Sequence, residues 1–235
     1  MSKILMITQR YPYPTDRGDK VRVFNIAEQF AKHHSVYCLN FTEPNPINSR
    51  PDVFRKTFHC KKSALKMMVD MVLAIFSFIP LQVAKFKSQE MNKMALEIIK
   101  NEEIEIVYGF HIRSLPVLKQ IRKQYPNIKI IGDYTDTMGL YITRMKKFTK
   151  SLFLKVVLFV EKPRVESYEK KHVNICDEIW LISEQDINYH PEWESNHKKF
   201  RRVSNGVSQE LLLDLNEKKD NKIVFVGFMG VESIE

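Results

Sequence analysis

The chain has 235 residues, which is enough for one large domain, or for one domain and the start of another. Hydrophobic residues make up 44% of it, so we expect a packed core and exclude the disordered and fibrous classes. The formal net charge of +9 suits an anionic partner, such as a phosphorylated substrate, an anionic membrane surface or nucleic acid.

Cys38, Cys60 and Cys176 form no C-x-x-C pair, and their number is odd. We therefore expect reduced thiols in a cytoplasmic protein, with no disulfide framework and no metal site. The first residues enter a strand at once and lack the apolar stretch of a signal peptide. The apolar run at residues 64–79 is shorter than the ~20 residues that a membrane-spanning helix needs.

The first forty residues predict one strand–helix–strand unit, right-handed by the general rule. Residues 3–8 form a continuous apolar run, typical of a strand buried on both faces of a parallel sheet. A loop rich in proline and charge follows, and residues 35–41 predict the second strand. Between them, from Asp19, apolar residues recur at the three- and four-residue spacing of a helix: Val21, Phe24, Ala27, Phe30 and Ala31.

The same alternation continues downstream. Helices are predicted at residues 64–79, 88–101, 114–125 and about 140–174, with Pro163 as the candidate break in the last one. Strands are predicted at 104–110, 129–133, 178–182 and 200–203, and Ser183 is expected to cap a further helix. The predicted fold class is α/β, a Rossmann-like parallel sheet with helices on both faces.

We assign residues 1–215 to this domain. A charged linker occupies residues 216–221, and a buried-type strand follows at 222–227. We interpret residues 216–235 as the linker and first strand of a second domain that is not completed. The alternative is that this strand joins the sheet of the first domain.

In a doubly wound sheet, ligands bind beyond the carboxyl ends of the strands. The loop after the first strand places Arg17, Gly18, Asp19 and Lys20 at a helix N-terminus, where free N–H groups favour a phosphate. Gly18 would let the backbone approach the ligand closely, although it could also serve only a tight turn. The chain contains neither the G-x-G-x-x-G fingerprint nor a P-loop.

Three further candidates follow other predicted strand ends. His111 comes directly after one strand, and Asp133 and Asp136 come after another, so all three are expected near the same cleft. The alternative is a polar surface histidine and an aspartate pair that caps a turn.

The first loop carries a recognisable pattern, P-Y-P-x-D-x-G-D-K-x-R, over residues 12–22. It resembles the family 4 glycosyltransferases, retaining enzymes of GT-B fold, and in particular the sugar transferases of bacterial exopolysaccharide systems. Residues 133–136 resemble the D-x-x-D turn of that group, and residues 176–184 resemble its strand before the domain crossover. Residues 205–207 match its N-G-V turn, and residues 223–227 resemble the first strand of its donor domain.

The resemblance implies the N-terminal, acceptor-side half of a GT-B enzyme. Such an enzyme transfers a sugar from a nucleotide-sugar to an acceptor, here a lipid-linked or polysaccharide acceptor in cell-surface polysaccharide biosynthesis. In the family the first-loop glycine lies near the donor diphosphate, which points to Gly18, and a histidine at a middle strand end lies near the transferred sugar, which points to His111. No cofactor is implied. The family's donor domain is not represented, so we expect this chain alone to show no turnover.

Two other functions stay open. One is a non-catalytic remnant of such an enzyme that binds a membrane or a partner. The other is nucleic-acid binding, which the charge allows but no motif supports, so we expect no nucleic-acid partner.

A basic, apolar segment predicts attachment to the inner face of the plasma membrane as a peripheral protein. Apolar residues between 148 and 159 are interleaved with basic ones, and such a helix can lie in the plane of the lipid headgroups. A second segment, residues 61–79, places lysines before an apolar helix. The alternative is that both helices pack against the sheet as core. The basic residues expected at the membrane are Arg144, Lys146, Lys147, Lys150 and Lys155.

Overall fold

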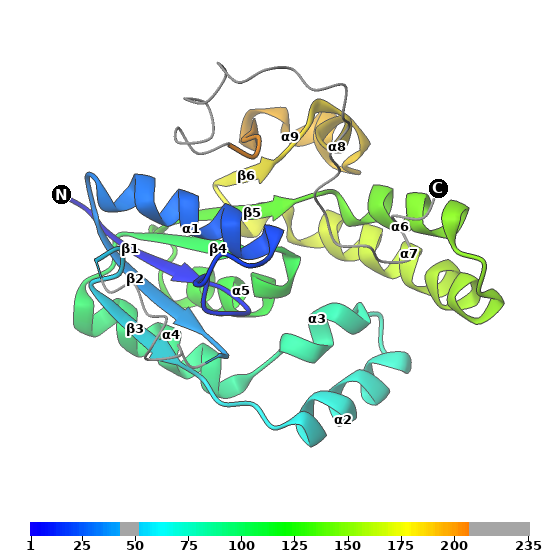
Figure 1. Ribbon diagram of the computed structural model, residues 1–235, viewed down its shortest axis with the longest axis horizontal. Coiled ribbons are helices and arrows are strands. Elements are labelled where there is room, and N and C mark those ends of the chain that lie inside the picture. Colours follow the sequence, from blue (N-terminus) through cyan, green and yellow to red (C-terminus); the bar gives the residue numbers. More distant parts are fainter. Residues whose placement is uncertain (43–51, 207–235) are drawn as a thin grey trace, which may run out of the picture.

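The computed structural model describes residues 1–42 and 52–206, and within them the fold is built on one parallel sheet (Figure 1). Its seven strands follow the order β3-β2-β1-β4-β5-β6-β7, and every neighbouring pair is parallel. The predicted α/β, Rossmann-like class is confirmed. The strands are β1 (Lys3–Ile7), β2 (Ser35–Asn40), β3 (Lys56–His59), β4 (Ile106–Phe110), β5 (Lys129–Thr135), β6 (Glu178–Leu181) and β7 (Phe200–Arg202).

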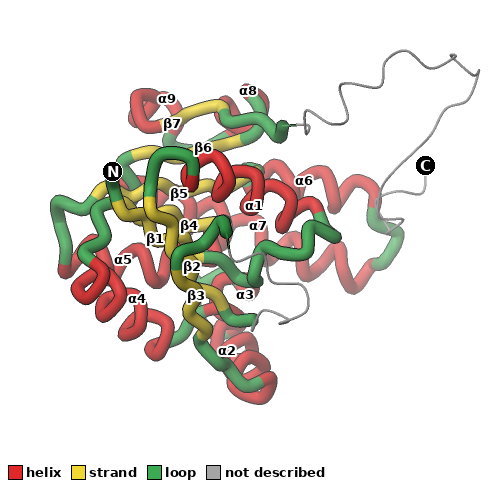
Figure 2. Tube along the Cα trace, turned by 60° about the vertical axis from the view of Figure 1, so that its left-hand side comes forward, coloured by secondary structure: helices red, strands yellow, loops and turns green. Residues whose placement is uncertain are grey.

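Helices cover both faces of the sheet, which explains why the central strands read as continuous apolar runs. Successive residues of a strand point to opposite faces. Ile4 and Met6 of β1 therefore belong to the core under α1, whereas Leu5 and Ile7 belong to the core on the opposite face. Figure 2 shows the strands between α1 on one side and α4 and α5 on the other.

Four of the described helices, α2, α4, α7 and α8, begin where a serine side chain caps them. Ser63, Ser88, Ser151 and Ser183 each accept a hydrogen bond from the backbone N–H three residues later, and the predicted cap at Ser183 is confirmed. The helices are α1 (Gly18–Ala31), α2 (Ala64–Ile75), α3 (Leu81–Phe86), α4 (Gln89–Glu102), α5 (Leu115–Gln124), α6 (Met138–Phe148), α7 (Leu152–His172), α8 (Glu184–Tyr189) and α9 (Trp193–Asn196). Short 3₁₀ turns occupy Ile112–Ser114, Val173–Ile175 and His197–Lys199.

The predicted apolar stripe of α1 was wrong at its first position. Val21 is exposed, and Arg22 and Val23 are buried together with Phe24 and Ala27. Phe24 and Ala27 stay buried as predicted, and Arg22 joins them because it turns inward to a buried partner, which periodicity of apolar residues alone does not reveal.

The segment at 64–79, predicted as one helix, contains one helix and a turn. Helix α2 ends at Ile75, and Pro80 then forms the N-cap position of α3. Strand β3 was not predicted, because it is a short edge strand without a buried apolar run.

The long helical region after residue 138 was predicted to break at Pro163, and that prediction was wrong. The break lies at residues 149–151, where Ser151 caps α7, and Pro163 lies inside α7. Pro163 is exposed, so water can hydrate the helix carbonyl that the missing N–H leaves without a partner.

Several predictions fall outside the described residues: the linker at 216–221, the strand at 222–227 and the end of the N-G-V turn. Among the residues that are described, no helix combines the length and apolar character needed to cross a bilayer.

Candidate functional site

The predicted site residues lie at the carboxyl ends of the parallel strands. This is the end toward which the arrows point in Figure 1. The loop after β1 leads into the N-terminus of α1, and His111 follows β4. Asp133 and Thr135 lie among the last three residues of β5. Because β1, β4 and β5 are neighbours in the sheet, these segments are brought side by side.

A buried ion pair lies beneath this edge. Nε and Nη2 of Arg22 donate to the two carboxylate oxygens of Asp133, each at 2.9 Å. The side chains of Arg22 and Asp133 are 4% and 0% exposed. Such a bidentate pair is among the stronger hydrogen-bonded contacts in proteins, and it ties α1 to β5.

The same carboxylate accepts two further hydrogen bonds. The Tyr108 hydroxyl donates to it at 2.6 Å, and the Thr135 backbone N–H donates at 3.2 Å. Nη1 of Arg22 donates to the side-chain oxygen of Asn205 at 2.8 Å, which brings in the segment after β7. Burial, followed by the Asp133 carboxylate, raises the pKa of Tyr108 well above its usual value, so the phenol keeps its proton.

This arrangement assigns Asp133 a position under the cleft rather than at its surface. Both of its oxygens are engaged by groups of the protein, and none of it is exposed. Asp133 therefore holds α1, β4 and β5 in register, and a ligand in the cleft would reach it only if this network opened.

The loop before α1 carries a chain of charges. Asp19, in the first turn of α1, lies 3.0 Å from Nη1 of Arg10 and 3.5 Å from Nε of Arg17. Lys20 pairs with Asp16 at 2.8 Å. Asp16 and Arg17 are exposed and the rest are half-buried, so these side chains form the rim of the candidate site.

Gly18 is the first residue of α1 and is exposed. A Cβ atom built on it would meet no other atom of the protein within 4 Å, and its φ is not positive. The turn itself therefore does not require glycine, and the open space above Gly18 lies directly at the free N–H groups of a 14-residue helix.

His111 has a backbone conformation that side chains rarely adopt, with φ 62° and ψ 158°. This region is almost restricted to glycine, and its strain is typical of functional positions. The conformation is held from both sides: the His111 N–H donates to the Asp133 carbonyl at 2.6 Å, and the Ser114 hydroxyl donates to the His111 carbonyl at 2.8 Å.

The imidazole of His111 is neutral at physiological pH. Burial, helped by the nearby Arg113 guanidinium, lowers the pKa of His111 to about 3. Its Nδ1 is shielded from solvent and has no hydrogen-bond partner in the described part of the chain. The residue as a whole is half-buried, so its neutral imidazole would meet a ligand through the part of the ring other than this shielded nitrogen.

Asp136 is the one of the two predicted aspartates that stays partly open to solvent. Burial, with the nearby carboxylate of Asp186, raises the pKa of Asp136 above its usual value. Its backbone N–H donates to the Tyr134 carbonyl at 2.8 Å, so the turn fixes its position.

Residue-by-residue reading of the sequence missed Arg10, Arg22 and Arg113 as parts of this site. Arg22 belongs to the quoted first-loop pattern, and an arginine between apolar positions of a helix was the signal that could have marked it. Arg113 is mostly buried, and its guanidinium lies over the Phe86 ring at 5.5 Å. No signal in the sequence pointed to Arg113.

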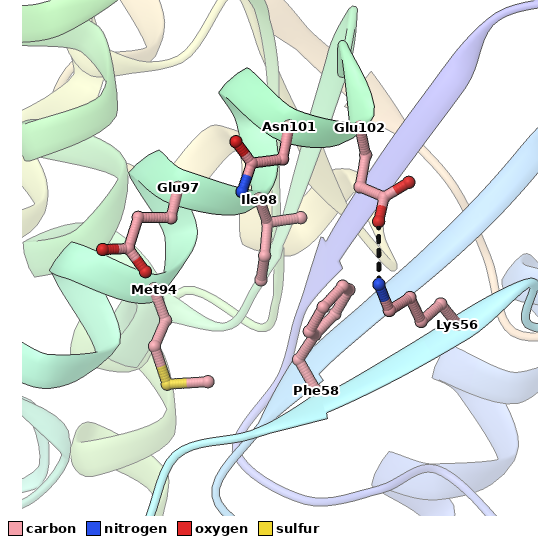
Figure 3. A pocket seen from close by; sticks show the side chains of 7 residues that line it. All are labelled: Lys56, Phe58, Met94, Glu97, Ile98, Asn101 and Glu102. Atoms are coloured by element: carbon pink, nitrogen blue, oxygen red, sulfur yellow. Dashed lines mark hydrogen bonds and ion pairs between the residues drawn. The ribbon is translucent and has the colours of Figure 1, made fainter.

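A pocket of about 180 Å³ lies elsewhere, between the edge strand β3 and α4 (Figure 3). Lys56 from the start of β3 meets Glu102 from the end of α4 at its rim, with Nζ and Oε1 3.0 Å apart. These residues lie toward the amino ends of the strands, whereas ligands of open α/β sheets bind at the carboxyl ends. The pocket is therefore not part of the candidate site.

Comparison with solved structures identifies the architecture. Sucrose-phosphate synthase from Thermosynechococcus elongatus superposes with a TM-score of 0.63 at 16% sequence identity, covering 90% of this chain and 50% of that one. The fold is that of one half of a GT-B glycosyltransferase. The catalytic domain of starch synthase IV from Arabidopsis thaliana, solved with ADP and acarbose, gives a TM-score of 0.54 at 10% identity, covering 88% and 52%.

This chain thus spans about half the length of both GT-B structures. By sequence, no family profile and no curated protein matches it. Within the part of the chain that is described, no grouping of three or more His, Cys, Asp or Glu side chains could hold a metal ion.

Proposed function

We propose that this domain is the N-terminal, acceptor-binding half of a glycosyltransferase of GT-B fold. The whole enzyme would transfer a sugar from a nucleotide-sugar to a lipid-linked or polysaccharide acceptor. The proposal starts from the half-GT-B fold, and the observation that carries it is His111. A strained, neutral histidine lies at the strand edge where ligands of such sheets bind.

His111 would hydrogen-bond a hydroxyl of the sugar being transferred. Sugars are uncharged and rich in hydroxyl groups, so a neutral imidazole suits them better than a charged group. The backbone hydrogen bonds that hold His111 in its strained conformation keep the ring in place before the ligand arrives.

The N-terminus of α1 would face the diphosphate of the donor. The free N–H groups of the first turn and the open space at Gly18 offer positive potential to a leaving diphosphate. Arg17 and Lys20 stand beside them, each paired with a carboxylate of the same loop, Asp19 and Asp16. Stabilising the charge that develops on a leaving group is a principal source of catalytic rate enhancement. Asp136, with its raised pKa, would add a polar contact on the acceptor side.

Ligand-binding NMR with isotope-labelled protein tests the proposal. Acceptor analogues and nucleotide-sugars are titrated, and the shifted backbone signals are mapped. We expect the shifts to cluster at residues 17–20, 111 and 134–136. H111A should weaken this binding about tenfold, as expected for one lost hydrogen bond of roughly 1.4 kcal/mol.

The control variant is Lys56→Ala, which alters the pocket between β3 and α4, toward the amino ends of the strands. It should leave ligand binding unchanged. Shifts that cluster at Lys56 and Glu102 instead, or equal binding by H111A and the unmodified protein, would contradict the assignment of the site.

A further inference from the structure

Helix α2 exposes its apolar face. Its only buried residue is Ala74. The exposed apolar residues recur at three- and four-residue spacing along one side of the helix, so they form a continuous stripe. They are Leu65, Met68, Val69, Val72, Leu73 and Phe76.

The N-terminal half of α7 repeats this pattern. Leu158, Glu161 and Val165 are buried on its inner side. On the outer side, Phe153 is 79% exposed and Phe159 is 66% exposed, together with Leu152 and Val156. We call the exposed apolar side chains of α2 and of residues 148–160 the tip surface.

Hydrogen bonds from α7 to the end of α2 and the start of α3 connect the two helices that carry the tip surface. Nη2 of Arg164 in α7 donates to the carbonyl of Ile75 at the end of α2. Oε2 of Glu161 accepts from the backbone N–H of Leu81 at 2.9 Å. Figure 1 shows α2, α3, α6 and α7 projecting on the side toward which the strands point, the side of the candidate site.

The charge around the α7 part of the tip surface is of one sign, whereas α2 carries Asp70, which pairs with Lys62. Residues 138–160 contain five basic residues and no aspartate or glutamate. Nζ of Lys146 lies 4.8 Å from the centre of the Phe159 ring, and Nζ of Lys147 lies 5.7 Å from that of Phe148. Lys150 is also exposed.

Arg144 lies apart from this group of lysines. Its Nη2 donates to Oε1 of Gln185 at 2.6 Å, so it lies against α8 and the candidate site rather than among the exposed phenylalanines. The basic residues next to the α7 part of the tip surface are therefore the four lysines Lys146, Lys147, Lys150 and Lys155, and α2 adds the exposed Lys66.

We propose that the tip surface docks on an anionic lipid bilayer. Exposed phenylalanine and leucine side chains flanked by lysines match the composition of helices that lie at the headgroup boundary. A second copy of the chain is a poorer occupant, because a two-fold contact would place the lysines of both copies against each other without acidic partners in this segment. The proposal does not depend on the glycosyltransferase function.

Flotation with lipid vesicles tests the proposal. We expect the protein to float with phosphatidylcholine vesicles that contain phosphatidylglycerol, and to bind pure phosphatidylcholine vesicles far less. Raising the salt from about 0.1 M to about 1 M shortens the screening length from about 10 Å to about 3 Å, so binding should weaken.

Each lysine near an anionic surface strengthens binding about fivefold, so K146E/K147E/K150E should bind at least a hundredfold more weakly. The matched control K100E/K119E/K123E makes the same change in net charge on exposed lysines of α4 and α5 and should bind nearly as well as the unmodified protein. The variant F153S/F159S, which alters two exposed side chains, should bind roughly tenfold more weakly or worse while keeping its circular dichroism spectrum.

Equal losses in the two lysine variants would mean that only the net charge acts, and would overturn the proposal. So would unchanged binding by F153S/F159S. Absence of vesicle binding together with a dimer that F153S/F159S dissociates would assign the tip surface to a second copy instead.

Discussion

Replacing Asp133 with asparagine tests whether this residue supports the cleft or lines it. The side chains of Asp133 and Arg22 are 0% and 4% exposed, so the variant leaves a buried guanidinium opposite an amide instead of a carboxylate. Removing one partner of a buried ion pair typically costs about 3–5 kcal/mol of stability. The Tyr108 hydroxyl can still donate to the Asn oxygen, which places the expected loss for D133N toward the lower end, about 3 kcal/mol.

The double variant R22M/D133N separates the pair from the rest of the site. Methionine fills much of the space of arginine without its charge, so no buried cation is left without a partner. We therefore expect R22M/D133N to be more stable than D133N alone, with a coupling of about 1–3 kcal/mol between the two positions.

Urea unfolding at neutral pH measures these losses by linear extrapolation of the unfolding free energy. Far-UV circular dichroism follows the helices. Trp180, whose ring centre lies 6.0 Å from that of Tyr108, reports by fluorescence on the network itself. Two results together would show that the pair does not hold the sheet to α1. One is a loss below about 1 kcal/mol in D133N, and the other is a loss in R22M/D133N that equals the sum of the losses in R22M and D133N within ~0.5 kcal/mol. Asp133 would then be free to act as a ligand-binding residue.

Two further changes have defined outcomes. In G18A the added methyl group meets no protein atom within 4 Å, so the free energy of unfolding should change by less than about 1 kcal/mol. Binding of a diphosphate-containing ligand should weaken. A thermal melt measures the first effect and a titration the second, and a large loss of stability would contradict the open space at Gly18. Burial raises the pKa of Glu169 to about 8, so the folded state holds a proton that the unfolded state releases near pH 4.5. The protein therefore loses stability as the pH rises from about 4.5 to about 8. E169Q stays neutral, so its unfolding free energy relative to the unmodified protein should rise by roughly 3–5 kcal/mol between pH 5 and pH 8, and a flat difference in urea titrations at both pH values would refute the shift.

The strands were predictable because a strand that is buried on both faces needs apolar residues at successive positions. Residues 4–7 and 36–39 are continuous apolar runs, and both lie in interior strands of the sheet. Strand β3 pairs on one side only and buries little, so its sequence, Lys-Thr-Phe-His, carries no comparable signal. The parallel arrangement of the sheet followed from the alternation of strands and helices, whereas the order of the strands was not predicted.

The gathering of the candidate residues at the carboxyl ends of the strands was predictable, but the hydrogen bonds among them were not. The rule that ligands bind at strand ends pointed to His111 and Asp133. It did not reveal that Asp133 pairs with Arg22, because that contact joins residues 111 positions apart. Likewise, the strain at His111 is a property of the backbone that no residue pattern expresses.

The direction of the apolar stripes was the main point that the sequence left open. Residues 64–75 have the same helical spacing whether the stripe faces the sheet or the surroundings, so periodicity predicts the helix and not its orientation. The described structure orients the stripe outward, as it does that of the first half of α7.

The tip surface and the candidate site share one side of the domain, and this bears on the class of acceptor. A domain docked through α2 and α7 would hold the strand ends close to the bilayer, within reach of an acceptor whose lipid tail is embedded there. If both proposals hold, F153S/F159S should lower transfer to a vesicle-embedded acceptor about tenfold and leave transfer to a water-soluble acceptor of the same headgroup unchanged. H111A should lower both equally, because the sugar contact is the same in the two reactions. The measurement is sugar transfer by the complete enzyme that contains this domain, with each acceptor in turn. Equal loss on both acceptors in F153S/F159S would show that the tip surface acts on the fold of the site rather than on access to the membrane.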